Sequence, residues 1–250
     1  MQFRIQRHDQ VDSTNELALR AIASGSARHG DVHVARAQTA GRGRRGASWF
    51  SSAGQGLYVS LVLAPTRPLE GVWLSVASGL AVHDAVASLG LTQARLKWPN
   101  DVLVGEAKLA GLLIESRGLP STAPWYVVGL GLNVLQRDFP EDLRAQRKVT
   151  SLALEGLDVS VDAALETCLA SFAVRLEQAQ SGLQGLGEQY LAATGLANAQ
   201  VAVQLTERVL RGIALGIEVH SNCLHLDCGS QGVLQVPLEH VLGLGKIHSE

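Results

Sequence analysis

Apolar and polar positions along the chain follow two different periods. Strand-like runs, in which every second side chain faces the core, are expected at residues 32–38, 57–63 and 125–130. Apolar residues spaced three and four apart predict helices at residues 73–89, 160–177 and about 183–194. The first of these helices is long and is expected to be amphipathic. A polar and charged stretch at residues 136–150 predicts a loop.

Two local motifs refine this pattern. Ser13-Thr14-Asn15-Glu16 has the spacing of a capping box, which places a helix N-terminus at Ser13. Residues 96–116 predict two strands joined by a turn at Gly105-Glu106, and Pro99 ends the segment before them. From about residue 199 the pattern changes to short alternating segments separated by Gly, Ser and Asn. These segments predict a small all-β unit of roughly fifty residues.

Composition narrows the class of protein. The 250 residues are 46% hydrophobic and 18% charged, which excludes a disordered chain. The net charge of −2 excludes a globally basic nucleic-acid binder. Three cysteines cannot form a disulfide framework for this length, and no run of 18 apolar residues predicts a membrane span. With no leader-like start, we expect a cytoplasmic protein.

A glycine-arginine loop, Gly41-Arg42-Gly43-Arg44-Arg45-Gly46, carries the first candidate chemistry. It fits the Rossmann glycine pattern, but a strand follows where that fingerprint needs a helix. It also fits the glycines of a Walker A loop, but Ala47 stands where the phosphate-binding lysine is required. What remains is three guanidinium groups on glycine hinges, which suit phosphate or carboxylate oxygens.

Two simpler interpretations of this loop stay open from the residues alone. A basic loop is often only solvated, and arginine-glycine runs also bind RNA. The chain has only eleven Tyr, Trp and Phe residues, and they do not cluster near the loop. Base stacking on such rings is a usual part of single-strand recognition, so their scarcity here disfavours an RNA-binding module.

Lys97-Trp98-Pro99-Asn100-Asp101 forms a second candidate site at a strand-to-turn junction. Asp101 could bind Mg²⁺, which usually takes one or two carboxylates together with substrate phosphates. Lys108 follows the Gly105-Glu106 turn, so folding the hairpin back brings it towards the level of Asp101. An ordinary hairpin with a turn aspartate is an equally good interpretation of this segment by itself.

Together these segments resemble the catalytic part of the biotin protein ligases. The resemblance rests on DSTNELA (12–18), AQTAGRGRRGASWFSS (37–52), GLYVSLVL (56–63), KWPNDVLV (97–104), KLAGLLIES (108–116), VVGLGLNV (127–134) and VTSL (149–152). It implies an α+β fold, in which a mixed β-sheet with packed helices over residues 1–197 precedes a small SH3-like β-barrel over residues 198–250.

The resemblance also implies a two-step reaction. Biotin and ATP form biotinyl-5′-AMP, and the biotinyl group then passes to a lysine of the biotin carboxyl carrier protein of acetyl-CoA carboxylase. Fixed cations and Mg²⁺ suit this chemistry, because a carboxylate must approach a phosphate. Lipoate or octanoate ligases and transferases, which share a related fold, are the alternative, although they lack the KWPND segment.

Roles carry over residue by residue from the matching motifs. Lys108 and Arg44 are expected to be catalytic, and Asp101 to bind Mg²⁺. Contacts to biotin are expected from Ser13, Thr14, Asn15, Gln38, Gly41, Arg42, Gly43, Arg44, Trp49, Lys108, Gly111 and Gly129. Contacts to ATP are expected from Arg42, Arg44, Lys97, Trp98, Asn100, Lys108, Gly131 and Asn133. Gly129 and Gly131 are expected to let the chain pass close to the ligand.

Two departures from the family pattern carry predictions of their own. Ala47 stands where the family often has arginine, so one cation that could order the loop is missing. The capping box begins at residue 13, which leaves no room for the DNA-binding domain of many bacterial relatives. The chain is therefore expected to be a ligase without DNA binding, either as a monomer or as a homodimer.

Overall fold

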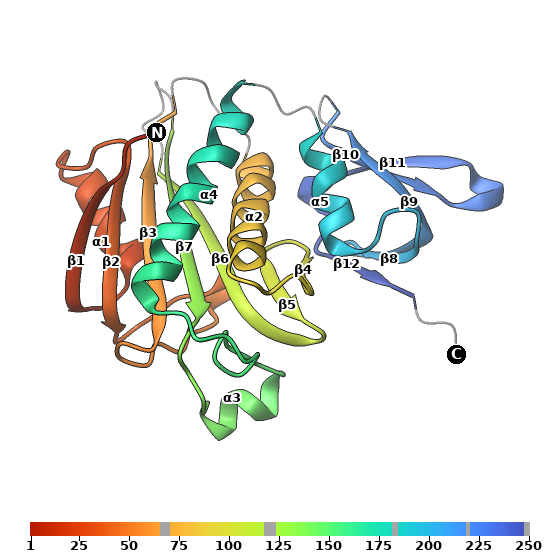
Figure 1. Cartoon of the computed structure of the whole chain (residues 1–250). Coiled ribbons are helices and arrows are strands. Elements are labelled where there is room, and N and C mark those ends of the chain that lie inside the picture. The colour runs from red at the N-terminus through yellow and green to blue at the C-terminus, as the bar shows by residue number, and fades with distance from the viewer. Residues whose placement is uncertain (66–70, 118–123, 182–184, 219–220, 248–250) are drawn as a thin grey trace.

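The computed structural model describes residues 1–65, 71–117, 124–181, 185–218 and 221–247, and they form two β-sheets with helices packed on the larger one (Figure 1). The larger sheet has seven strands in the order β1-β2-β3-β7-β6-β5-β4. Its strands are β1 (Arg4–Val11), β2 (Asp31–Gln38), β3 (Gly56–Leu63), β4 (Ala94–Lys97), β5 (Asp101–Val104), β6 (Ala107–Arg117) and β7 (Trp125–Asn133). β1 and β2 pair in parallel and the other neighbours are antiparallel. The predicted mixed sheet is confirmed.

Helices cover both faces of this sheet. They are α1 (Thr14–Ala23), α2 (Gly71–Ser88), α3 (Glu141–Gln146), α4 (Val161–Ser181) and α5 (Leu186–Thr194). α2 and α4 lie in front of the sheet in Figure 1, while α1 packs on the opposite face through Ala18 and Leu19 against Val62 and Val127. β3 is therefore buried on both faces. The face that carries α1 is also the face that carries the candidate site.

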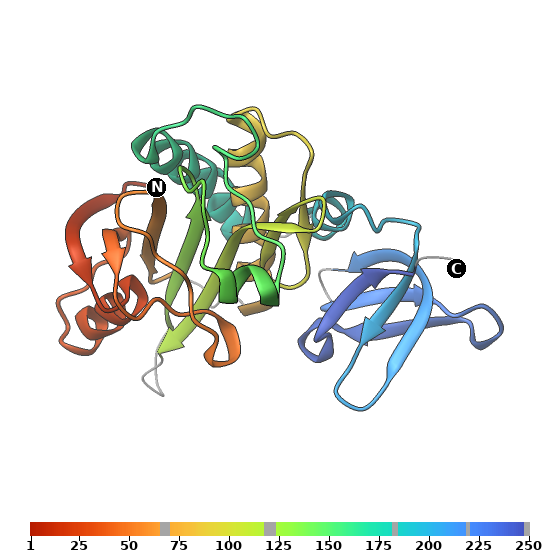
Figure 2. The same ribbon diagram turned by 90° about the horizontal axis from the view of Figure 1, so that it is seen from below.

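The second sheet lies after α5 and has the order β11-β10-β9-β8-β12. Its strands are β8 (Gln200–Gln204), β9 (Val209–Glu218), β10 (Cys223–Asp227), β11 (Val233–Pro237) and β12 (Gly243–Lys246). All their pairings are antiparallel, as predicted for a small barrel. Its apolar side chains join the main hydrophobic core, and the indole Nε1 of Trp98 donates to the carbonyl of Val241 at 2.7 Å. The two sheets thus share one core, and Figure 2 shows the smaller sheet to one side of the larger one.

The structure corrects several sequence expectations. α1 begins after Ser13, but the Ser13 side chain makes no capping hydrogen bond, and Glu16 pairs with Arg42 instead. α2 lies beside α4 on the sheet (Figure 1) and is buried around most of its circumference by the sheet, α4 and α5, so it is not amphipathic. The stretch at 136–150 contains the short helix α3. β1 was not predicted, because as an edge strand it exposes most of its polar residues.

The remaining elements lie near their predicted positions. α4 covers the helix expected at 160–177, and α5 covers the one expected at about 183–194, of which residues 183 and 184 lie outside the described residues. β5 and β6 form the hairpin around Gly105. Across the part of the chain that is described, no helix combines the length and apolar character that a membrane crossing needs.

Candidate active site

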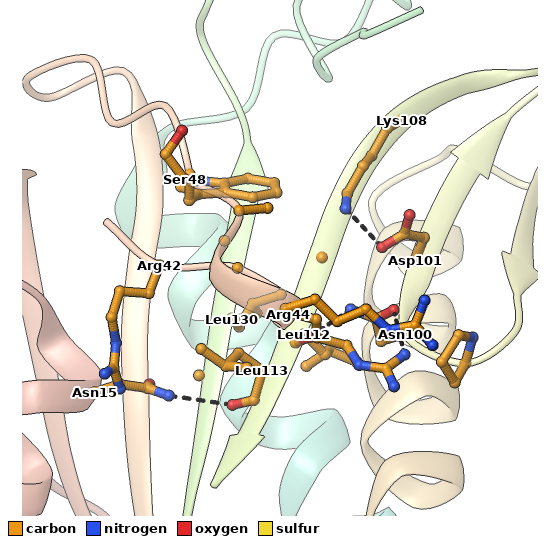
Figure 3. A pocket seen from close by; sticks show the side chains of 18 of the residues that line it. Asn15, Arg42, Arg44, Ser48, Asn100, Asp101, Lys108, Leu112, Leu113 and Leu130 are labelled. Atoms are coloured by element: carbon orange, nitrogen blue, oxygen red, sulfur yellow. Dashed lines mark hydrogen bonds and ion pairs between the residues drawn. The ribbon is translucent and has the colours of Figure 1, made fainter. Parts of the chain in front are cut away.

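A cavity of about 270 Å³ lies on the α1 face of the sheet, where the glycine-arginine loop faces β6, β7 and the junction between β4 and β5 (Figure 3). Segments far apart in sequence line it: Ser13, Thr14, Asn15, Gln38, Arg42, Gly43, Arg44, Arg45, Ala47, Ser48, Trp49, Trp98, Pro99, Asn100, Asp101, Lys108, Gly111, Leu112, Leu113, Gly129, Leu130, Gly131, Arg147 and Leu242. Among these described residues, five are cationic and one is a carboxylate. The cavity therefore suits an anionic ligand.

Glycines form the floor of the cavity. Gly111 of β6 and Gly131 of β7 are paired across the two strands, and the ring of Trp49 lies on them. A Cβ at Gly131 would fall 2.3 Å from the Trp49 ring, and one at Gly111 would fall 3.0 Å from it. A Cβ at Gly129 would fall 2.2 Å from Oδ1 of Asn15. These glycines thus make room for two side chains of the protein itself.

The glycine-arginine loop forms a small hairpin over this floor. The Gly43 amide donates to the Ala47 carbonyl at 2.6 Å, and the Trp49 amide donates to the Gly41 carbonyl at 2.9 Å. Arg45 has φ of 54° inside the 3₁₀ turn Arg44–Gly46, a left-handed conformation that is uncommon for a non-glycine residue. The turn separates the arginines, so that Arg42 and Arg44 point to opposite sides of the cavity (Figure 3).

Lys108 and Asp101 form an ion pair at the cationic end of the cavity. The Lys108 Nζ atom lies 2.6 Å from Oδ1 of Asp101, and both side chains are mostly buried. Burial lowers the pKa of Lys108, and Asp101 opposes that shift by stabilising the ammonium. The predicted approach of Lys108 to the level of Asp101 is confirmed. Nearby, Nη1 of Arg44 donates to Oδ1 of Asn100 at 3.3 Å.

Neutral polar side chains line the opposite end. The Thr14 amide and hydroxyl both donate to Oε1 of Gln38, at 2.9 and 3.2 Å, while Nε2 of Gln38 donates to the Ser51 hydroxyl at 3.0 Å. Ser13, whose hydroxyl caps no helix, is buried beside them. Hydroxyl and amide groups in this arrangement suit a neutral ligand group that both donates and accepts hydrogen bonds.

Sequence comparison identifies the family. Residues 8–133 match the biotin/lipoate A/B protein ligase family. The chain belongs to this family. It is 36% identical, over 90% of its own length and 84% of the relative's, to the biotin--[acetyl-CoA-carboxylase] ligase of Mycobacterium tuberculosis. It is also 40% identical, over 56% of its length, to the bifunctional ligase/repressor BirA of Salmonella typhimurium, of which it spans 43%.

Structural comparison agrees with this biotin/lipoate ligase family assignment. The biotin protein ligase from Aquifex aeolicus, in complex with biotin and ATP, superimposes with a TM-score of 0.78 at 27% identity. The match covers 98% of this chain and 99% of that one. It therefore includes both sheets, and the predicted α+β fold with a small C-terminal barrel is confirmed.

Most of the predicted site residues of this family member do line the cavity, but three do not. Gly41, the first residue of the glycine-arginine loop, lies beside it. Lys97 is exposed on β4, although its charge contributes to lowering the pKa of Lys108. Asn133 is buried, and its Nδ2 donates to the Thr150 carbonyl at 2.8 Å. The segment that Asn133 holds is hydrogen-bonded through its backbone to Lys108.

Sequence reasoning missed two kinds of contributor in this ligase-family site. Arg147 follows α3 and reaches the cavity because its segment packs beside the loop. In this packing the ring centroids of Phe50 and Phe139 lie 6.3 Å apart. Leu242 lies just before β12 of the second sheet and lines the cavity together with Trp98. The basic character of residues 144–148 was the only local signal for Arg147, and Leu242 had none.

Proposed function

We propose that this chain activates biotin with ATP to form biotinyl-5′-AMP and transfers the biotinyl group to a lysine of a biotin carboxyl carrier protein. One observation carries the proposal: a single cavity joins a neutral polar end at Thr14 and Gln38 to a cationic end at Arg44 and Lys108. Biotin has a neutral ureido head and an anionic tail, and ATP adds a polyanion. The named relatives are biotin ligases, which favours biotin over lipoate.

The proposed roles follow the two ends of the cavity. Ser13, Thr14 and Gln38 would hold the ureido head, and Trp49 would wall the hydrocarbon part of biotin. Arg44 and Lys108 would meet the biotin carboxylate and the α-phosphate, where two anions must approach each other. Asn100 and Trp98 would lie towards the nucleotide, and the exposed Lys97 and buried Asn133 would act from outside the cavity wall.

The chemistry consists of two displacements. A biotin carboxylate oxygen attacks the α-phosphorus of ATP, the bond to the β-phosphate oxygen breaks, and pyrophosphate leaves. The amine of the carrier lysine then attacks the acyl carbon, AMP leaves, and the nitrogen loses a proton. Lys108 and Arg44 would lower the barrier of the first step by stabilising the charge that develops on the phosphate. The cavity supplies orientation, which converts both steps into reactions of fixed partners.

Mg²⁺ would enter as part of the nucleotide substrate. Within the described ranges, no cluster of three or more His, Cys, Asp or Glu side chains could hold a metal ion. Asp101 is the one carboxylate of the cavity lining, which fits an ion bound mainly by phosphate oxygens and water. Asp101 would therefore approach the Mg²⁺ of the bound nucleotide while it also holds Lys108.

The carrier protein, the oligomeric state and the location are further parts of the proposal. We infer that the carrier belongs to acetyl-CoA carboxylase, as in the name of the Mycobacterium tuberculosis relative. The enzyme would act in the cytoplasm, without binding DNA, as a monomer or homodimer. Residues 1–197 would form the catalytic domain, and residues 198–250 a barrel domain that closes the cavity with Leu242.

Pyrophosphate release tests the proposed activity. The purified protein is incubated with ATP and Mg²⁺, together with biotin, with lipoate or with neither acid. Release that requires biotin, followed by biotin transfer to an added carrier domain, is the expected result. Release with lipoate alone would instead assign the lipoate activity of the family. No release with either acid, together with tight RNA binding, would overturn the proposal.

A further inference from the structure

The side chain of Arg42 is held between two carboxylates beneath the glycine-arginine loop. Its Nη1 atom lies 2.5 Å from Oε1 of Glu16 on α1, and its Nη2 atom contacts Oε2 of Glu115 on β6. Arg42 is the only one of the three loop arginines held by carboxylates in this way among the ion pairs of the described residues. Two negative charges surround one guanidinium, so Arg42 has no excess positive charge to offer a ligand carboxylate.

Among the hydrogen bonds of the described residues, Glu115 makes a second contact and Glu16 makes none besides Arg42. The Oε2 atom of Glu115 accepts a hydrogen bond from Nδ2 of Asn15 at 2.8 Å. The same Nδ2 donates to the Leu113 carbonyl at 3.2 Å, and Oδ1 of Asn15 accepts from the Ser60 hydroxyl at 2.5 Å. The Asn15 amide is thus satisfied on both sides by the protein. Figure 3 shows Asn15 turned towards Leu113 with Arg42 beside it.

The contacts continue from Asn15 to the neutral end of the cavity. The Ser60 hydroxyl lies 2.8 Å from the Thr14 hydroxyl, which donates to Gln38. Glu115 therefore contacts both Arg42, which anchors the loop, and Asn15, which belongs to the polar network at the neutral end of the cavity. A substitution at Glu115 therefore affects both Arg42 and Asn15, whereas a substitution at Glu16 affects Arg42 alone.

We propose that Glu115 is a positioning residue, whose carboxylate clamps the glycine-arginine loop through Arg42 and fixes Asn15 at the neutral polar end of the cavity. Glycines on both sides of Arg42 leave the loop backbone free to open, so ordering it costs conformational entropy. The charge-assisted contacts at Glu115 offset that cost before any ligand binds. Arg42 and Asn15 then hold the cavity wall in place, and Arg44 and Lys108 contact the carboxylate and phosphate of the ligands.

This inference rests on the proposed function and refines it. It reassigns Asn15 and the Arg42 side chain from ligand contacts to supports of the cavity. It also assigns a role to Glu115, which lies in the KLAGLLIES segment but had no role there, because its two contacts join residues separated by 73 and 100 positions.

Two readouts on matched variants test the clamp. Glu115→Gln keeps the size of the side chain and removes the charge, and Glu16→Gln is the control, because it weakens only one side of the Arg42 contact. For Glu115→Gln we expect the KM for biotin to rise about tenfold with kcat within about threefold, as for one weakened charge-assisted hydrogen bond. For Glu16→Gln both constants should stay within about twofold, since Arg42 keeps its contact with Glu115 and the hydrogen bond from Asn15 to Glu115 is untouched.

Limited digestion of the ligand-free protein with trypsin reports loop opening directly, because the loop carries three arginines. Cleavage after Arg42, Arg44 and Arg45 should accelerate about tenfold in Glu115→Gln, if one charge-assisted contact holds the loop closed. This readout does not require activity, so it tests the clamp even if biotin gives no pyrophosphate release. Glu115→Asp, which restores the charge, should recover part of both effects.

Equal effects of Glu115→Gln and Glu16→Gln on KM and on trypsin cleavage would overturn the inference. A fall in kcat with unchanged KM would also overturn it, because it would place Glu115 in the chemical step. Thermal unfolding of each variant identifies a folding defect, and if Glu115→Gln does not fold, the comparison of Glu115→Asp with wild type carries the same two readouts.

Discussion

Gly131→Ala is expected to disable the site while leaving the fold nearly intact. The added methyl would lie 2.3 Å from Cε2 of Trp49 and 2.6 Å from Nε1. An ordinary carbon contact is about 3.6 Å, so the indole must move by about 1.3 Å. Trp49 is only half-buried, so it can swing away from the sheet. We therefore expect a stability cost of about 1 kcal/mol, at the low end for overpacking.

The effect on activity should be much larger than the effect on stability. A displacement of about 1 Å in a group that positions substrate costs on the order of 100-fold in rate. Biotin-dependent pyrophosphate release should therefore fall about 100-fold in kcat/KM, with a melting temperature lowered by only about 2–4 °C. Gly216→Ala in β9 is the matched control, because a methyl there meets nothing within 4 Å.

A double-variant cycle identifies what the methyl strikes. With Trp49→Ala as the background, Gly131→Ala should cost less than about twofold, because residues in contact are energetically coupled and the clash has been removed. A 100-fold loss in both backgrounds would refute the reasoning. It would mean that Gly131 is needed for close approach of the ligand itself, as the sequence alone had suggested.

Three further predictions concern charge. Lys108→Ala should lower the rate of biotin-dependent pyrophosphate release by about 1,000-fold, as for loss of a preorganised group at the developing charge; a loss below about tenfold would contradict the assignment. Ala47→Arg, which adds a cation to a cavity lining that already includes Arg147, should slow escape of the adenylate, measured by rapid filtration, and an unchanged release rate would contradict it. Burial and the neighbouring His8 lower the pKa of His33 from its usual 6.5. Below pH 6.5 the unfolded chain therefore binds more protons than the folded chain, and the free energy of unfolding should fall as the pH drops through that value. His33→Gln should lose less stability there, and parallel denaturation curves for both proteins would contradict this.

The sequence by itself determined the elements whose pattern is local. Apolar periodicity placed α4, α5 and the hairpin of β5 and β6, because burial of one face depends on the spacing of neighbouring residues. The glycine-arginine loop and Lys108 also stood out, because arginines between glycines and a lysine after a tight turn are local features. Their pattern was specific enough to indicate the family.

Only the tertiary structure decided which side chains meet. Local pattern assigned Ser13 and Glu16 to a capping box, but Glu16 instead pairs with Arg42, which lies 26 positions away. Gly129 and Gly131, expected to let the chain pass close to a ligand, line the cavity and also make room for Asn15 and Trp49. Leu242 and Arg147 reach the cavity from segments that carry no motif. In each case the deciding contact joins distant parts of the chain, and its energy depends on packing and charge across the sheet, which local spacing does not encode.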